Sequence, residues 1–167
     1  MISLFSPKNH VPAKIQKEVF RRQLSLTKEY GSPLILHLRN SVEEGIQILE
    51  EMGIHPLKRI HFHCWTNTNP SLAFEVLQKF KQSYIGFTRV IKHNSNLKEL
   101  VKRISMERCL LETDSPYFKD GNPYSLPQDL LHVADIVSQV KNLKLLDICT
   151  MNLKNSQDMY PLAFKNN

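Results

Sequence analysis

Short apolar runs alternate along this chain with longer segments in which apolar residues recur at helical spacing. Continuous apolarity over so few residues is typical of a parallel strand that is buried on both faces. The pattern predicts four such strands, at residues 33–37, 59–64, 83–88 and 108–113.

Amphipathic helices are predicted around and between these strands. Ser41 and Glu44 have the spacing of a capping box, which predicts that a helix begins there and ends near Gly53. The first helix, at 11–30, has an apolar face formed by Val11, Ile15, Val19 and Leu26, with Phe20 and Leu24 nearby. The remaining helices are predicted from Pro70, around 97–104, over 129–140 and over most of 143–160.

This alternation predicts an α/β fold in which parallel strands are joined by right-handed crossover helices. Periodicity alone does not separate a partial barrel from an open, doubly wound sheet. The chain has no GxGxxG and no GxxxxGK[ST] segment, so the nucleotide-binding forms of the open sheet gain no support.

The length limits which barrel the chain can form. With 167 residues it has the size of one domain, whereas a complete (β/α)₈ barrel usually needs ~250 residues. Its 22 basic and 16 acidic residues give a formal charge of +6. Such a charge favours phosphate-rich partners but is also common in domains that bind no nucleic acid.

Cysteine usage and hydropathy indicate where the protein resides. The three cysteines are widely spaced and form no CxxC pair, which suits a reducing compartment. No apolar run approaches the ~20 residues of a membrane-spanning helix, and the N-terminus does not resemble a secretory signal. We therefore expect an intracellular protein, cytoplasmic or nuclear, without a membrane partner.

Polar residues that could perform chemistry lie where predicted strands end. His37 closes the first strand, His63 nearly closes the second, and Asp114 follows the fourth. Each alone is more typical of a hydrogen-bonded structural residue or a turn. Because the carboxyl ends of parallel strands meet at one edge, the three together predict a metal site of imidazole and carboxylate ligands.

His61 and His63 are two residues apart, so both side chains point to one face of their strand. They could form a metal-binding pair. Alternatively, His61 lies one layer deeper and is hydrogen-bonded within the fold, which we favour because it is further from the functional edge. Cys64 points to the opposite face and is predicted to lie in the core.

Four segments resemble motifs of the TatD-type deoxyribonucleases, in the order in which that family has them. The family motifs are a strand ending in His-x-Arg, then His-Cys-Phe-Thr, Gly-Phe-Thr and Leu-Glu-Thr-Asp-Ala/Ser-Pro. Their counterparts here are Leu34–Arg39, His63–Thr66, Tyr84–Thr88 and Leu110–Tyr117. The similarity runs from about His10 to Leu162, including Asn155 and Tyr160 of the family's C-terminal ending.

The resemblance implies a TIM-type (β/α) barrel that hydrolyses DNA phosphodiester bonds from a 3′ end with one or two divalent ions (Mg²⁺, Mn²⁺ or Zn²⁺). Carried over by motif, His37, His63 and Asp114 are metal ligands, and Asp114 is also catalytic. Arg39 would contact a substrate phosphate, or else form an ion pair with Glu112 or have a surface role. Glu112 itself would be structural or support the metal ligands.

The chain also departs from the family pattern. The family's first strand carries a His-x-His metal pair, and a bridging Glu follows its third strand; neither has a counterpart here. The only His-x-His, residues 61–63, lies in a different strand. Asn67 and Arg89 replace two family glycines in loops at the mouth of the barrel.

The expected protein is therefore a partial TIM-type barrel of about four parallel strands, with the N-terminal strands missing. Its domains are a tail at 1–10, an incomplete hydrolase domain at 11–162 and a tail at 163–167. The expected function is that of a truncated metal-dependent nuclease with DNA as substrate; no protein partner is predicted. Alternatives are an inactive remnant that binds metal, nucleic acid or a full-length partner, and an amidohydrolase acting on small molecules.

Overall fold

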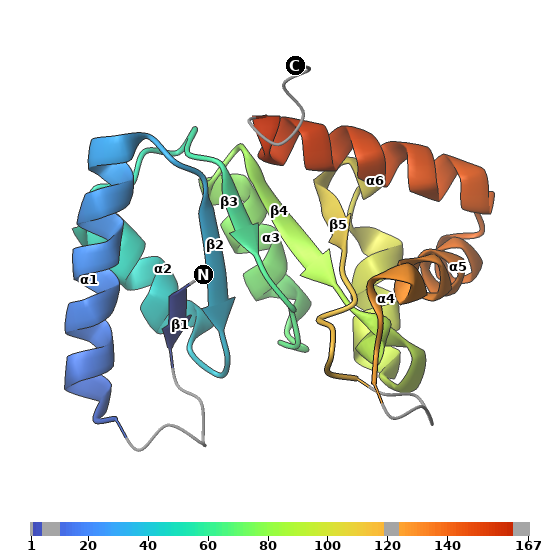
Figure 1. The fold of residues 1–167 in the computed structure, drawn as a ribbon, viewed down its shortest axis with the longest axis horizontal. Helices are drawn as coiled ribbons and strands as arrows, with labels where there is room; N and C mark the ends of the chain where they lie inside the picture. The colour runs from blue at the N-terminus through green and yellow to red at the C-terminus, as the bar shows by residue number, and fades with distance from the viewer. Residues whose placement is uncertain (1, 5–10, 119–123, 162–167) are drawn as a thin grey trace.

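The computed structural model describes residues 2–4, 11–118 and 124–161. Five parallel strands form one sheet in the order β1-β2-β3-β4-β5 (Figure 1). The strands are β1 (Ile2–Leu4), β2 (Leu34–Leu38), β3 (Ile60–Phe62), β4 (Ser83–Phe87) and β5 (Cys109–Leu111). The predicted α/β alternation and the four predicted strands are confirmed.

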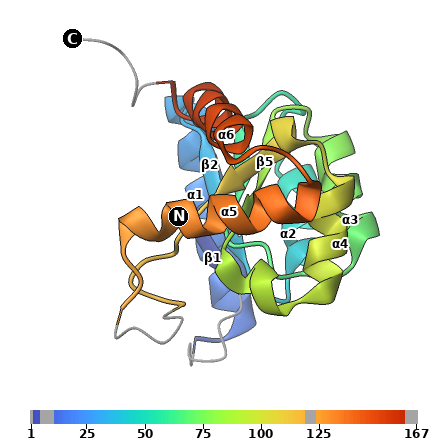
Figure 2. The ribbon, with the colours of Figure 1, turned by 90° about the vertical axis from the view of Figure 1, so that its right-hand side faces the viewer.

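Helices separate the strands and cover the sheet (Figures 1 and 2). They are α1 (Ala13–Tyr30), α2 (Val42–Glu51), α3 (Pro70–Lys79), α4 (Ser95–Arg103), α5 (Leu130–Lys141) and α6 (Leu145–Met159). Three short 3₁₀ helices are η1 (Arg89–His93), η2 (Met106–Arg108) and η3 (Pro127–Asp129). Within the described part of the chain, no helix has the length and apolar character that crossing a membrane requires.

The strand β1 lies within the segment 1–10 for which a tail was predicted, and it pairs with β2 in register Ser3↔His37. A run of only three residues carries no periodicity, so the sequence pattern could not indicate it. β1 and β5 are the two edges of the described sheet. The predicted C-terminal tail at 163–167 lies outside the described residues.

The face of α1 that contacts the core differs from the predicted stripe. Ile15 and Val19 are 47% and 51% exposed, whereas Phe20 and Leu24 are fully buried. The two stripes are adjacent on the helix, and the large ring of Phe20 makes the second stripe the more favourable one to bury. Periodicity defines an apolar sector of a helix but not which part of it contacts the sheet.

The capping box predicted at Ser41 is not formed. Helix α2 does begin after Ser41, but the serine side chain makes no capping hydrogen bond. Glu44 instead pairs with Lys17 of α1, with 2.5 Å between Oε1 and Nζ. The carboxylate therefore links two helices rather than closing the first turn of its own.

Candidate metal centre at the carboxyl ends of the strands

The structure brings the three predicted ligands together at one edge of the sheet. His37 lies near the end of β2, His63 directly follows β3, and Asp114 follows β5. The His37 and His63 ring centroids are 5.4 Å apart, and His63 Nε2 lies 3.2 Å from Asp114 Oδ1. The backbone of Asp114 has a left-handed φ of 52°, a conformation that Asp tolerates better than most residues.

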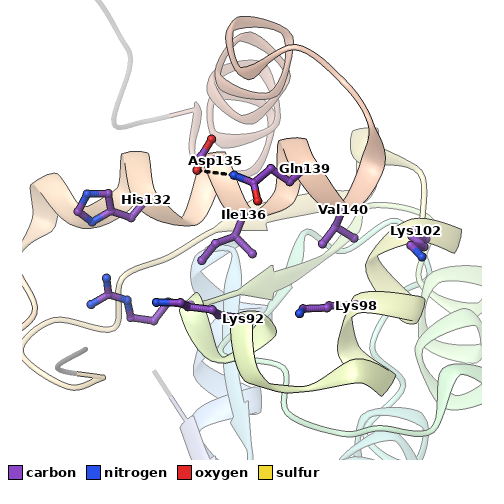
Figure 3. Close-up of a pocket in the computed structure, with 9 residues that line it drawn as sticks. Lys92, Lys98, Lys102, His132, Asp135, Ile136, Gln139 and Val140 are labelled. Atoms are coloured by element: carbon purple, nitrogen blue, oxygen red, sulfur yellow. Dashed lines mark hydrogen bonds between the residues drawn. The ribbon is translucent and has the colours of Figure 1, made fainter. Parts of the chain in front are cut away.

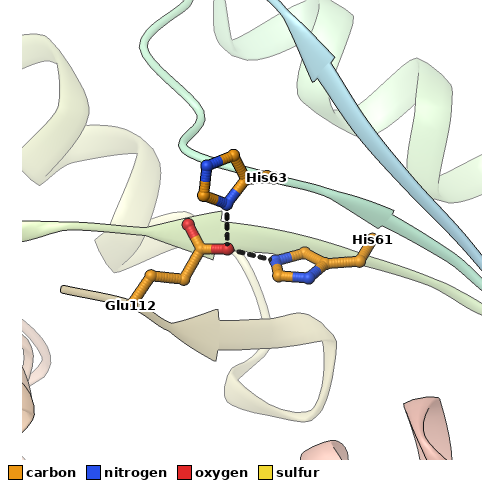
Figure 4. A group of neighbouring side chains, drawn as sticks. All are labelled: His61, His63 and Glu112. Atoms are coloured by element: carbon orange, nitrogen blue, oxygen red, sulfur yellow. Dashed lines mark hydrogen bonds and ion pairs between the residues drawn. The ribbon is translucent and has the colours of Figure 1, made fainter. Parts of the chain in front are cut away.

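Glu112 contacts the His63 imidazole at Nδ1 (Figure 4), whereas Asp114 lies beside Nε2 of the same ring. Its Oε1 lies 2.8 Å from His63 Nδ1 and 2.6 Å from His61 Nε2, and its Oε2 accepts a hydrogen bond of 2.8 Å from the Cys64 amide. A carboxylate on the second nitrogen of a metal-binding histidine fixes the ring and its tautomer. Glu112 therefore orients His63, which is the contact that its predicted supporting role requires.

The interior position that we favoured for His61 is also confirmed. This side chain is buried, and its Nδ1 lies 2.5 Å from the Tyr160 hydroxyl, while its Nε2 faces Glu112. Nδ1 of His61 thus has a hydrogen-bond partner inside the protein, whereas its Nε2 is buried 2.6 Å from the Glu112 carboxylate without a well-directed hydrogen bond. The alternative ion pair between Arg39 and Glu112 is not formed; Arg39 is exposed at the mouth of the site.

Two overlapping groups of side chains are candidates for a metal site, and among the described residues only the first has three ligand atoms close to one another. His61, His63 and Glu112 have ligand atoms within 4.8 Å of one another. Glu112 Oε1, however, already lies 2.6 Å from His61 Nε2 and 2.8 Å from His63 Nδ1. A cation there would have to displace contacts that the protein itself makes.

The second group, His37, His63 and Asp114, leaves ligand atoms available. His37 Nδ1 is buried without a hydrogen-bond partner among the described residues, which is costly for a polar atom. The 3.2 Å between His63 Nε2 and Asp114 Oδ1 is close to the spacing of two ligands around one ion. Metal–ligand bonds of ~2.0–2.1 Å at a tetrahedral angle place ligand atoms about 3.3 Å apart. His63 and Asp114 therefore have the spacing of two ligands of one divalent cation. The ligand atoms of all three described residues do not lie within 4.8 Å of one another, so His37 would have to move closer to complete the site.

Charge at the site favours the protonation states that a metal needs. Burial and the neighbouring His63 lower the pKa of His37, which keeps its imidazole neutral. Burial would raise the pKa of Glu112, but its hydrogen bonds to His61 and His63 lower it to about 2. Because ionised Glu112 accepts from Nδ1–H of His63, the neutral His63 ring presents a lone pair at Nε2.

Metal binding is expected to strengthen as pH rises. Burial lowers the pKa of His63, but the stronger combined effect of Glu112 and Asp114 raises it above the ordinary value. Below this raised pKa a proton occupies the nitrogen that must bind the cation, so binding has to release it. Calorimetric titration with Mn²⁺ from about pH 5.5 to about pH 8.5 should show rising affinity and proton release. An affinity independent of pH would contradict the assignment of His63.

Gly86 of β4 makes room for this network. A Cβ atom there would lie 2.5 Å from His61 Nε2 and 2.6 Å from Glu112 Cδ, closer than side-chain atoms approach. This residue was not among the predicted site residues, although a glycine within an apolar strand often marks a close approach. Tyr160, which contacts His61, was noted only as part of the C-terminal motif.

Two asparagines of α6 complete the edge of β5 beside the site. Asn155 donates hydrogen bonds of 2.8 and 2.7 Å to the carbonyls of Met106 and Cys109, and Asn152 accepts one of 2.9 Å from the Leu111 amide. These contacts hold the strand that leads to Glu112 and Asp114. Cys64 is buried, as predicted, and burial raises its pKa to about 12, so its thiol remains protonated.

A parallel α/β sheet with imidazole and carboxylate ligands at its carboxyl edge is an arrangement used by metal-dependent hydrolases. Residues 5–161 match the family model described as TatD related DNase, and the chain belongs to this family. Its resemblance to that family in sequence motifs is thereby confirmed.

Relatives and solved structures agree with this membership. The chain is 31% identical over 166 residues to the human 3'-5' RNA nuclease TATDN2, covering 95% of this chain and 22% of that protein. It is 31% identical over 153 residues to the uncharacterized metal-dependent hydrolase YabD of Bacillus subtilis, covering 89% of this chain and 59% of that protein.

The fold matches that of YjjV, a TatD homologue from Escherichia coli, with a TM-score of 0.81 and 22% identity. A TatD family hydrolase from Entamoeba histolytica gives the same TM-score at 21% identity. Each match covers 95% of this chain and 61% of the other. The chain thus spans about three fifths of these structures and of the Bacillus relative.

Proposed function

We propose that the chain carries the metal centre of a nuclease that hydrolyses phosphodiester bonds at the 3′ end of a DNA strand. His37, His63 and Asp114 are the proposed ligands of a divalent cation. The observation that carries this proposal is the unpartnered, buried His37 Nδ1 beside a His63 whose Nε2 faces Asp114. Family membership and the nuclease names of relatives support the substrate class.

Each residue of the site has its own proposed role in hydrolysis. A divalent cation, when bound, stabilises charge on a phosphoryl group and makes water a stronger acid. Asp114 also accepts the proton of the attacking water, and Glu112 keeps the lone pair of His63 directed at the centre. Arg39, exposed two residues beyond His37, contacts a phosphate oxygen of the substrate.

The experiment that tests the proposal is the release of nucleotides from a 3′-labelled single DNA strand by the purified chain. Release is expected with Mn²⁺, Mg²⁺ or Zn²⁺ and is expected to stop when a chelator is added. A 5′-labelled strand run in parallel should shorten stepwise, which identifies attack from the 3′ end. An RNA strand and small amide or ester substrates, tested alongside, identify the preferred substrate class.

Two results of this experiment would contradict the nuclease proposal, and each favours a different alternative. Metal binding without cleavage of any substrate would contradict the nuclease proposal and favour the non-catalytic alternative, a chain that binds metal, nucleic acid or a full-length partner. Faster cleavage of small amides than of DNA would favour an amidohydrolase instead.

A further inference from the structure

A groove separates α5 from η1 and α4 on the side of the molecule shown in Figure 3. Its volume is about 690 Å³. One wall carries positively charged side chains and the other carries polar and apolar residues of α5. We define the basic groove by its lining residues Arg89, Lys92, Lys98, Lys102, His132, Asp135, Ile136, Gln139 and Val140.

The lysines of the groove form a row of one charge sign. Lys98 and Lys102 are four residues apart in α4, so their side chains leave the helix on one face, and Lys92 lies before them on η1 (Figure 3). Among the described residues, Lys98 and Lys102 have no ion pair. The one carboxylate of the groove, Asp135, accepts a hydrogen bond of 2.8 Å from Gln139 on its own helix. Like charges so placed repel each other, and a polyanion would relieve that repulsion.

The groove leads toward the candidate metal centre. Arg89 also lines a smaller cavity of about 130 Å³ together with Val90, His93 and Phe118. Arg89 Nη1 donates a hydrogen bond of 3.2 Å to the Phe118 carbonyl. Phe118 belongs to the loop that begins at Asp114, in which the Tyr117 amide donates to the Asp114 carbonyl. The basic row therefore starts beside the loop that carries a proposed metal ligand.

We infer that the basic groove binds the phosphate backbone of a single-stranded nucleic acid whose 3′ end lies at the metal centre. This inference rests on the proposed function. Evenly spaced phosphates suit a row of lysines, and such contacts add affinity without reading sequence. The side chain of Tyr117, 67% exposed in the Asp114 loop, offers a surface on which a base can stack. This aromatic favours nucleic acid over an acidic peptide as the occupant.

The test is binding of fluorescent single-stranded oligonucleotides of about 20 nucleotides to the full chain, measured by anisotropy in the presence of a chelator. Lys98→Glu/Lys102→Glu should weaken binding of DNA and RNA strands by about tenfold or more at low salt. Because each lost phosphate contact on a single strand reduces the slope of log affinity against log salt by about 0.7, the double variant should reduce it by about 1.4. Lys98→Gln/Lys102→Gln should show the same slope change with a smaller loss of affinity.

The matched control is Lys14→Glu/Lys154→Glu, which changes the charge equally at two exposed lysines that line neither cavity. Control and groove variants with the same affinity and the same salt slope would overturn the inference. Polyglutamate of equal charge that competes as well as DNA would also overturn it, because the groove would then bind acidic chains in general.

Hydrolysis assays distinguish failure of this inference from failure of the proposed function. The groove variant should cleave a dinucleotide as fast as the unmodified chain does, because Lys98 and Lys102 are not part of the candidate metal centre, while cleaving the long strand more slowly. Loss of binding in chelator without any hydrolysis by the unmodified chain would support the groove and refute the nuclease. An equal loss on dinucleotide and long strand would contradict the groove as a remote binding site.

Discussion

Replacing His63 or Asp114 with alanine is expected to reduce metal-dependent strand hydrolysis by about a hundredfold to a thousandfold. Each change removes one of two proposed ligand atoms that lie 3.2 Å apart, and with it the charge or lone pair proposed to hold the cation. The affinity for Mn²⁺ should fall in the same variants, so that part of the lost activity returns at high metal concentration. Single-turnover release from a 3′-labelled strand over a range of Mn²⁺ concentrations measures both effects.

The control for these variants is His55→Ala, which removes an exposed histidine whose Nδ1 accepts a hydrogen bond from the Leu57 amide. It should leave both hydrolysis and metal affinity unchanged. If His63→Ala or Asp114→Ala hydrolysed the strand as fast as His55→Ala, the proposed ligands would be wrong.

Glu112→Ala is expected to lower the free energy of unfolding by about 3 kcal/mol, since it leaves buried polar groups without their shared acceptor. His61, His63 and the Cys64 amide all contact this carboxylate, whose side chain is only 10% exposed. Metal affinity should also fall about 10–100-fold, because His63 is no longer held. Urea denaturation and calorimetric metal titration measure the two effects.

The lowered pKa of Glu112 also predicts how the free energy of unfolding depends on pH. A carboxylate whose pKa is lowered by folding stabilises the protein above its ordinary pKa and loses that effect as pH falls. The unmodified chain should therefore lose stability between about pH 4.5 and about pH 2, and Glu112→Ala should lack this part of the decrease. Glu75→Ala, at an exposed glutamate of α3, is the control and should change stability by less than about 0.5 kcal/mol. Equal stability of the two variants would contradict the role of Glu112.

The sequence predicted the parts of the fold that depend on local patterns. Apolar runs identified β2 to β5 because each strand is buried, as Leu36, Phe62 and Ile85 are. The rule that parallel strands present their carboxyl ends at one edge was sufficient to place His37, His63 and Asp114 together. β1 was missed because three residues carry no pattern.

Contacts between distant residues could not be predicted in this way. His61 and Tyr160 are 99 positions apart, and Glu112 meets both histidines only once β3, β4 and β5 are paired. The space that Gly86 leaves for them likewise depends on the assembled sheet. The motif indicated a role for Glu112. Only the structure shows that its carboxylate contacts His61 and His63, whereas His37 Nδ1 has no hydrogen-bond partner among the described residues.

The most direct test of the proposed metal centre is a crystal structure of the chain soaked in Mn²⁺, with anomalous scattering used to locate the ion. We predict a peak bounded by His37 Nδ1, His63 Nε2 and the Asp114 carboxylate, with Glu112 still on Nδ1 of His63. A peak between His61 and Glu112, or no peak at this edge of the sheet under conditions in which the protein binds Mn²⁺ in solution, would contradict this prediction.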